Sequence, residues 1–152
     1  MSRTSRFTIL SVAAFAIVTS ALAAPAATKI DLGTGTAKDK EAMVFNKDKL
    51  TAKAGSKITI NFKNNSASKG MTHNFVLVKP GKLDSVLAAS IAAGPDKGWV
   101  ADSADVIAKG KLIDAGESEK IEFTAPTEPG DYPFVCTFPG HATMRGILKV
   151  TK

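Results

Sequence analysis

The sequence is poor in residues that build metal and redox sites: it has one cysteine and two histidines in 152 residues. A single cysteine excludes an internal disulfide. It also argues against a structural zinc site, which usually has two or more cysteines, and against an iron–sulfur cluster, which needs several. The cysteine is therefore a free thiol, half of an intermolecular disulfide, or a ligand to another kind of metal.

Basic residues do not alternate with aromatic residues in any run, although nucleic-acid-binding surfaces combine the two. Nucleic acid is therefore not expected as a partner. The lysines are scattered along the chain, which is typical of a solvated surface. A mild preference for acidic protein partners is compatible with their excess over acidic residues.

The N-terminal segment has the pattern of a signal peptide. Arg3 and Arg6 form a basic start, an apolar run extends from Phe7 to about Val18, and Ala21-Leu22-Ala23 supplies small residues before a cleavage site. The apolar run is short for a transmembrane helix. We therefore predict a cleaved signal peptide over residues 1–24.

Cleavage is expected near Ala23 or Ala24, with Ala24-Pro25-Ala26 as a second possible end and an uncleaved anchor as the alternative. The mature chain, residues 25–152, has the length of one ordinary domain. Loss of Arg3 and Arg6 lowers the formal charge from +6 to +4. Export predicts a periplasmic location, where an exposed free thiol is at risk of oxidation, and this favours a metal ligand.

Several mature segments have the pattern of short strands. Apolar and polar residues alternate with period two over 56–64 and 118–124, and residues 132–136 and 146–151 are strand-like, as is the apolar run 73–78. Glycine, proline and asparagine separate these runs as turns. The pattern predicts an all-β protein, an antiparallel sandwich.

One segment differs from the strands. Leu83 to Ala93 has apolar residues at helical spacing, and Gly94-Pro95 ends the pattern. Residues 96–110 lack periodicity and include Trp99. We expect 82–110 to form a flap with a short helix, inserted between strands, in which Trp99 packs the flap onto the domain.

The cysteine and the histidines form a recognisable set of metal ligands. His141 follows Cys136 by five positions, Met144 lies three positions further, and His73 lies in a distant strand-like segment. Copper that cycles between two oxidation states tolerates three strong ligands and a weak axial sulfur. The sequence therefore predicts a copper site with Cys136, His73 and His141 in a trigonal plane and Met144 in the axial position.

Two segments resemble those of azurins. Met71-Thr72-His73-Asn74-Phe75-Val76-Leu77 is similar to their first ligand segment, and Cys136-Thr137-Phe138-Pro139-Gly140-His141 is similar to their ligand loop. Tyr132, four residues before the cysteine, also fits. The resemblance covers most of the mature domain, including the flap, and implies the cupredoxin fold, a Greek-key β-sandwich.

The chain departs from azurins in two respects. Azurins have three residues between the second histidine and the methionine, whereas here Ala142 and Thr143 alone separate His141 from Met144. This shorter spacing resembles the amicyanin loop. Azurins also have a disulfide near the N-terminus, for which this chain has no cysteines.

The resemblance implies roles for residues around the metal. The carbonyl of Thr72 would lie near copper on the second axial side. The backbone N–H groups of Asn74 and Phe138 would donate to the sulfur of Cys136, and the Asn74 side chain would bind the Thr137 region. Such contacts stabilise the thiolate and raise the reduction potential.

These features predict a periplasmic electron carrier and not an enzyme. It would be a monomer without membrane attachment after cleavage of the signal peptide. Its partners would be periplasmic redox proteins, such as c-type cytochromes or a reductase or oxidase, which dock briefly. The resemblance implies that electrons pass through the edge of His141, within an apolar patch of Met71, Pro139, Gly140 and Ala142.

Two other functions use the same residues. A copper-handling protein, either a chaperone or a scavenger, would favour exposed ligands such as methionine clusters, but the chain has four methionines in all. A thiol enzyme needs a base and a third orienting group beside the cysteine. A copper oxidase needs further histidines, and none remain.

Overall fold

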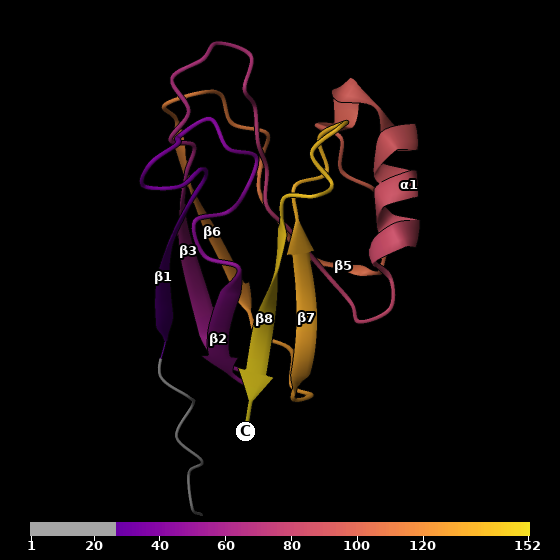
Figure 1. Ribbon diagram of the computed structural model, residues 1–152. Coiled ribbons are helices and arrows are strands. Elements are labelled where there is room, and N and C mark those ends of the chain that lie inside the picture. Colours follow the sequence, from indigo (N-terminus) through magenta and orange to yellow (C-terminus); the bar gives the residue numbers. More distant parts are fainter. Residues whose placement is uncertain (1–26) are drawn as a thin grey trace, which may run out of the picture.

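The computed structural model describes residues 27–152, so the predicted signal peptide lies outside the described residues. Within these residues, two sheets pack face to face, and one α-helix lies on the outside of the second sheet (Figure 1). The all-β sandwich with a short helix in a flap is confirmed.

The first sheet has the order β1 (Thr28–Gly33), β3 (Lys57–Lys63), β6 (Ser118–Thr124). The second has the order β2 (Lys49–Lys53), β8 (Arg145–Thr151), β7 (Gly130–Val135), β4 (Val76–Val78), β5 (Val106–Lys109).

Strand β3 shows how the alternating pattern produces a sandwich. Its residues Ile58, Ile60 and Phe62 are buried, while the residues between them are half-buried or exposed. Ile60 lies opposite Ile121 of the antiparallel strand β6. Because successive side chains of a strand point to opposite faces, one row of apolar residues covers the core.

The expectation of purely antiparallel sheets is wrong at both N-terminal strands. β1 pairs in parallel with β3, and β2 pairs in parallel with β8. The sequence pattern did not predict β1 and β2 as strands. Both lie at sheet edges. Whether a strand pairs in parallel depends on a partner distant in the chain, which the local pattern does not record.

A cluster of phenylalanines fills the core between the sheets beneath the predicted metal site. The Phe134 ring lies 5.1 Å from that of Phe45 and 5.4 Å from that of Phe75. Gly146 lies opposite Phe134 across β7 and β8. A Cβ on Gly146 would collide with the Phe134 ring and would lie 2.5 Å from the carbonyl oxygen of Asp48. The glycine is therefore required for this packing.

The helix α1 (Leu83–Ala93) has the predicted bounds and packs through a narrow face. Val86 is buried in a second apolar cluster with Val76, Val78 and Val135 of the sheet. Ile91, which the helical pattern places on the same face, is 58% exposed instead. The helix contacts the sheet mainly through its first two turns.

The rest of the flap contains a 3₁₀ turn, η1 (Pro95–Lys97), and strand β5, which the sequence did not predict. Trp99 has a left-handed backbone with φ of 57°, directly after Gly98 with φ of 60°. A bulky residue rarely adopts this conformation. The surrounding contacts must therefore hold it, and these contacts lie at the metal site described below.

The β7–β8 loop lies at the end of the sandwich opposite the C-terminus, beside the flap (Figure 1). Strand β4 is shorter than the predicted strand 73–78, and His73 forms an isolated bridge with Ile113 just before it. Within residues 27–152, no helix has the length and apolar character needed to cross a membrane.

Candidate metal centre

Three predicted ligands converge at this end of the sandwich. The Sγ of Cys136 lies 3.9 Å from Nδ1 of His73 and 3.8 Å from Nδ1 of His141. All three residues are buried. The structure thus brings together one thiol and two imidazoles from chain positions as far apart as 73 and 141.

The spacing of these atoms fits a metal ion between them. A metal–sulfur bond of about 2.3 Å and a metal–nitrogen bond of about 2.0 Å that meet at about 120° separate sulfur from nitrogen by about 3.7 Å. The separations of 3.8 and 3.9 Å are close to this value. The donor set also suits copper, because one thiolate and two imidazoles match a trigonal blue-copper site.

Backbone hydrogen bonds shape the loop that carries two of the ligands. The N–H of Cys136 donates to the carbonyl of Met144 at 2.9 Å, and the N–H of Met144 donates to the carbonyl of His141 at 2.8 Å. The N–H of His141 donates to the carbonyl of Phe138 at 3.0 Å. Gly140 has φ of 84°, which a residue with a side chain rarely adopts. The loop is therefore fixed by its own backbone.

The axial donors stay predictions. Met144 is buried beneath the loop and belongs to the main core cluster, which is the position expected of a weak sulfur ligand. Thr72 is half-buried and directly precedes His73. Two backbone hydrogen bonds hold His73 to Ile113, at 3.1 and 2.9 Å. The strand that carries the distant ligand is thus anchored independently of any metal.

Two opposing effects act on the pKa of the Cys136 thiol. Burial raises the pKa of Cys136, while the backbone N–H groups of Asn74 and Phe138 lower it. These are the two donors that the resemblance implied. A cation bound to the sulfur would overcome the effect of burial and keep the thiolate deprotonated.

Both histidines are set up to bind metal near neutral pH. Burial lowers the pKa of His73 to about 4, with a further lowering from His141 and an opposing effect from Glu41. Burial also lowers the pKa of His141. Because an imidazole must be neutral to bind a metal, protons compete weakly for these ligands at neutral pH.

A hydrogen-bond network joins the two ligand segments to the flap. The Asn74 side chain accepts from the Thr137 N–H at 2.8 Å and donates to the Thr137 hydroxyl at 2.9 Å. The Thr137 hydroxyl in turn donates to the carbonyl of Trp99 at 2.5 Å, and Asn74 donates to the carbonyl of Gly98 at 3.3 Å. The Asn74–Thr137 contact was implied by the resemblance. The part played by Trp99 was missed, because it uses backbone atoms that no sequence pattern marks.

One ligand lies close to solvent. His141 is 8% exposed, and the neighbouring residues Gly140 and Ala142 are exposed. The ring of Phe138 lies 4.9 Å from that of His141 and shields its other side. Pro139 and Met71 are half-buried. The edge of the His141 imidazole, surrounded by small and apolar residues, is thus the part of the site that lies nearest to solvent.

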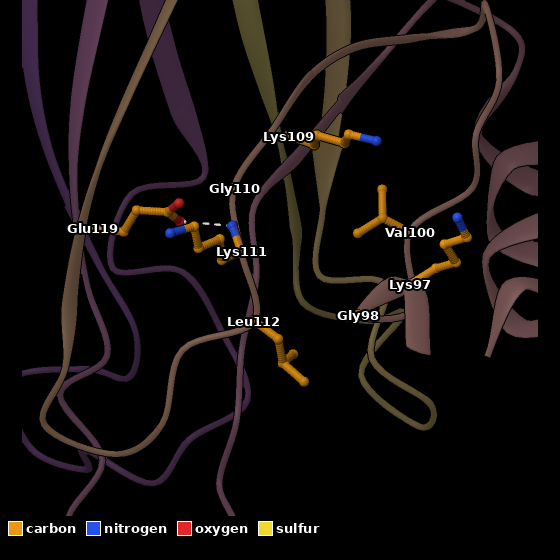
Figure 2. A pocket seen from close by; sticks show the side chains of 8 residues that line it. All are labelled: Lys97, Gly98, Val100, Lys109, Gly110, Lys111, Leu112 and Glu119. Atoms are coloured by element: carbon orange, nitrogen blue, oxygen red, sulfur yellow. Dashed lines mark hydrogen bonds between the residues drawn. The ribbon is translucent and has the colours of Figure 1, made fainter. Parts of the chain in front are cut away.

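A separate pocket of about 430 Å³ opens between the flap and the segment that follows β5 (Figure 2). Three lysines, two apolar residues and one carboxylate line it, with Gly98 and Gly110: Lys97, Lys109, Lys111, Val100, Leu112 and Glu119. The Glu119 carboxylate accepts the backbone N–H of Lys111 at 2.8 Å. This lining has no cysteine, histidine or serine, and so none of the side chains that form the strong bonds of a copper site.

Comparisons with known proteins agree with this geometry. A family model described as copper binding proteins of the plastocyanin/azurin family matches residues 33–151. Auracyanin-A of Chloroflexus aurantiacus is 40% identical over 114 residues, which cover 72% of this chain and 68% of that protein. Azurin-1 of Alcaligenes xylosoxydans xylosoxydans is 36% identical over 117 residues, 72% of this chain and 91% of that protein. The structure of reduced auracyanin from Roseiflexus castenholzii has a TM-score of 0.73 at 35% identity, over 82% of this chain and 98% of that chain.

Proposed function

The chain belongs to the plastocyanin/azurin family of copper-binding proteins, and from that premise we propose that it is a periplasmic carrier of single electrons. Copper is the metal of this family. Cys136, His73 and His141 would hold it, with Met144 and the Thr72 carbonyl as weaker axial donors. Bound copper would supply the one-electron Cu(I)/Cu(II) couple.

One observation carries the proposal: the two Nδ1 atoms lie 3.9 and 3.8 Å from the sulfur in a buried and prebuilt arrangement. Electron transfer is fast where the ligand geometry changes little between oxidation states. The backbone bonds of the ligand loop and the anchoring of His73 by Ile113 would limit such change. The scaffold, and not the metal, would fix the site.

The chemistry of the rest of the molecule supports a carrier over an enzyme. A copper enzyme needs room for a substrate beside the metal, but the three donors are buried. The lysine-lined pocket of Figure 2 contains neither histidine nor cysteine that could hold a second, catalytic copper. A copper-handling protein would favour exposed ligands that exchange metal readily, and buried ligands count against that alternative.

The small apolar surface around His141 supports brief docking of redox partners, such as c-type cytochromes or a reductase or oxidase. The predicted signal peptide over residues 1–24 supports export to the periplasm. It would leave residues 25–152 as one monomeric domain without membrane attachment.

The test is to express the full chain in a periplasm-forming host, locate it by cell fractionation and load it with Cu(II). We expect an intensely blue protein in the periplasmic fraction. Mixed with reduced c-type cytochromes in a stopped-flow instrument, it should lose its colour as the cytochrome is oxidised in equal amount. A colourless Cu(II) protein, or a blue one that exchanges electrons with no cytochrome, would contradict the proposal.

A further inference from the structure

Three buried side-chain atoms in the described part of the chain lack a hydrogen-bond partner: Oε2 of Glu41, Oγ1 of Thr72 and Nε2 of His73. Buried polar atoms are nearly always hydrogen-bonded, so each requires a physical explanation. Two of the three are chemically complementary. A carboxylate oxygen accepts a proton, and the second nitrogen of a metal-binding imidazole carries one.

The chemistry of His73 determines what its Nε2 atom requires. Its Nδ1 atom faces the sulfur of Cys136, so Nδ1 is the metal-binding nitrogen and Nε2 must carry the hydrogen. Metal-binding histidines almost always donate this second N–H, and the acceptor fixes both the tautomer and the ring orientation. The two hydrogen bonds between His73 and Ile113 involve backbone atoms alone and do not determine which ring nitrogen carries the hydrogen.

Glu41 is held where its charge acts on His73. Its Oε1 atom accepts the backbone N–H of Ala67 at 2.7 Å and that of Ser68 at 3.3 Å, in the loop that leads to His73. The hydrogen bond from Ala67 lowers the pKa of Glu41, and the charge of His73 lowers it too. Glu41 in turn raises the pKa of His73 against the effect of burial. With Oε1 occupied by the loop, Oε2 is the oxygen available to the imidazole.

We propose that Glu41 is a positioning residue of the copper site, whose Oε2 receives the Nε2–H of His73 through a single bridging water. This inference rests on the proposed function. A buried water of this kind typically joins two to four unpaired polar groups, and the nearby hydroxyl of Thr72 is one candidate for a third. The bridge holds His73 in the tautomer that leaves Nδ1 open to copper.

The carboxylate also contributes a full negative charge to one ligand of the metal. A negative charge stabilises Cu(II) more than Cu(I), because the oxidised ion carries the larger positive charge. Glu41 therefore lowers the reduction potential and strengthens the binding of Cu(II). The hydroxyl of Thr72 and a backbone carbonyl carry no net charge, so neither would lower the reduction potential in this way.

The test compares Glu41→Gln with Glu117→Gln. Glutamine at position 41 keeps an oxygen for the N–H of Ala67 but removes the charge and the second acceptor. Glu117 is the matched control: it is an exposed glutamate whose Oε2 accepts the backbone N–H of Asp114 at 2.9 Å, and its replacement removes the same charge. Both variants are loaded with copper, titrated for Cu(II) affinity and measured by voltammetry.

We expect Glu41→Gln to weaken Cu(II) binding by about 10- to 100-fold, as is typical when the partner of a metal-binding histidine is lost. Its reduction potential should rise. Glu117→Gln should change both properties much less. If the two variants shift affinity and potential equally, a general loss of charge explains the effect and the proposal is overturned.

A second measurement uses the protein without copper and does not depend on electron transfer. Nitrogen-15 NMR of the imidazoles should show His73 in the Nε2–H form in the wild-type apo protein and a larger Nδ1–H fraction in Glu41→Gln. A wild-type apo protein that already populates the Nδ1–H form would overturn the proposal. Failure of the proposed function can be distinguished from failure of this inference. In the first case, the wild-type Cu(II) protein itself would be colourless or inert toward cytochromes.

Discussion

The backbone N–H of Cys136 donates to the carbonyl of Met144 over 2.9 Å, so a main-chain bond closes the loop between the predicted thiolate ligand and the predicted axial ligand. This bond involves no side chain and requires no metal. A change in either side chain should therefore alter the metal chemistry and leave the loop in place.

Replacement of the thiol tests the source of colour. Cys136→Ser removes the sulfur whose bond to copper gives blue sites their intense colour. We expect the blue absorption to disappear. The fold should persist, with an unfolding free energy lowered by about 1–3 kcal/mol because a hydroxyl is buried in place of the thiol. Visible absorption and circular dichroism measure the two effects, and an intensely blue serine variant would refute the ligand assignment.

Replacement of the methionine tests the axial position. Met144→Leu conserves volume in the core, at a cost of less than about 1.5 kcal/mol. It should keep copper and colour but raise the reduction potential, because a weak sulfur donor is lost; Met144→Gln should lower the potential through a stronger oxygen donor. Voltammetry measures both. Identical potentials in all three proteins would show that Met144 does not act on copper.

A charge beside His141 tests the route of the electron. Ala142 is exposed next to this ligand, so Ala142→Glu would place an unpaired charge in the docking surface. Electron self-exchange, measured by NMR line broadening, should slow markedly while the visible spectrum stays nearly unchanged. Ala89 is another exposed alanine, on α1, so Ala89→Glu is the control and should have little effect. Equal rates in the two variants would place the route at another face.

The apo protein should lose stability as the pH falls. The folded-state pKa of His73 is about 4, below its ordinary value of 6.5, so the unfolded chain binds the extra proton first. Stability from this group is complete above about pH 6.5 and declines toward pH 4. The loss between pH 7.5 and pH 5 should be about 2 kcal/mol. Urea titrations at several pH values measure the free energy of unfolding. If the apo His73→Gln variant lost as much stability over the same pH range, groups other than His73 would be responsible.

A methyl group on Gly146 tests the packing below the site. Gly146→Ala should force the ring of Phe134 or the carbonyl of Asp48 to move. We expect a loss of about 1–3 kcal/mol, as for other overpacked cores. Thermal unfolding of the apo protein measures it. An alanine variant as stable as the wild type would show that the phenylalanine cluster can rearrange without cost.

The sequence allowed prediction of the features that depend on local pattern. The alternation of Ile58, Ile60 and Phe62 predicted β3, and the helical spacing from Leu83 to Ala93 predicted α1 with its bounds. The rarity of cysteine and histidine pointed to the three residues that the structure brings together. In these cases, the signal lies in the identity of the side chains themselves.

Other features depend on partners distant in the chain, and local pattern does not record these partners. The parallel pairing of Lys49 with Ile147 is one example, and the exposure of Ile91 on the short contact face of α1 is another. The left-handed Trp99 uses its carbonyl to hold Thr137, a role of the backbone that the identity of the side chain does not reveal. Glu41 was not noted either, since its hydrogen bonds to Ala67 and Ser68 arise from the packing of two loops.

The parallel pairing of β2 with β8 also sets an order of events in time. β8 is the last strand of the chain, so the sheet that carries Cys136 cannot close until nearly the whole domain has been synthesised. Pairings between such distant segments form slowly, in milliseconds to seconds. The pairing of β4 with β7 in that sheet brings the segments of His73 and Cys136 together, and backbone hydrogen bonds that need no metal hold both segments. Copper would therefore enter an already folded protein, and scarcity of the metal would leave a folded apo form awaiting it instead of an unfolded chain exposed to proteolysis.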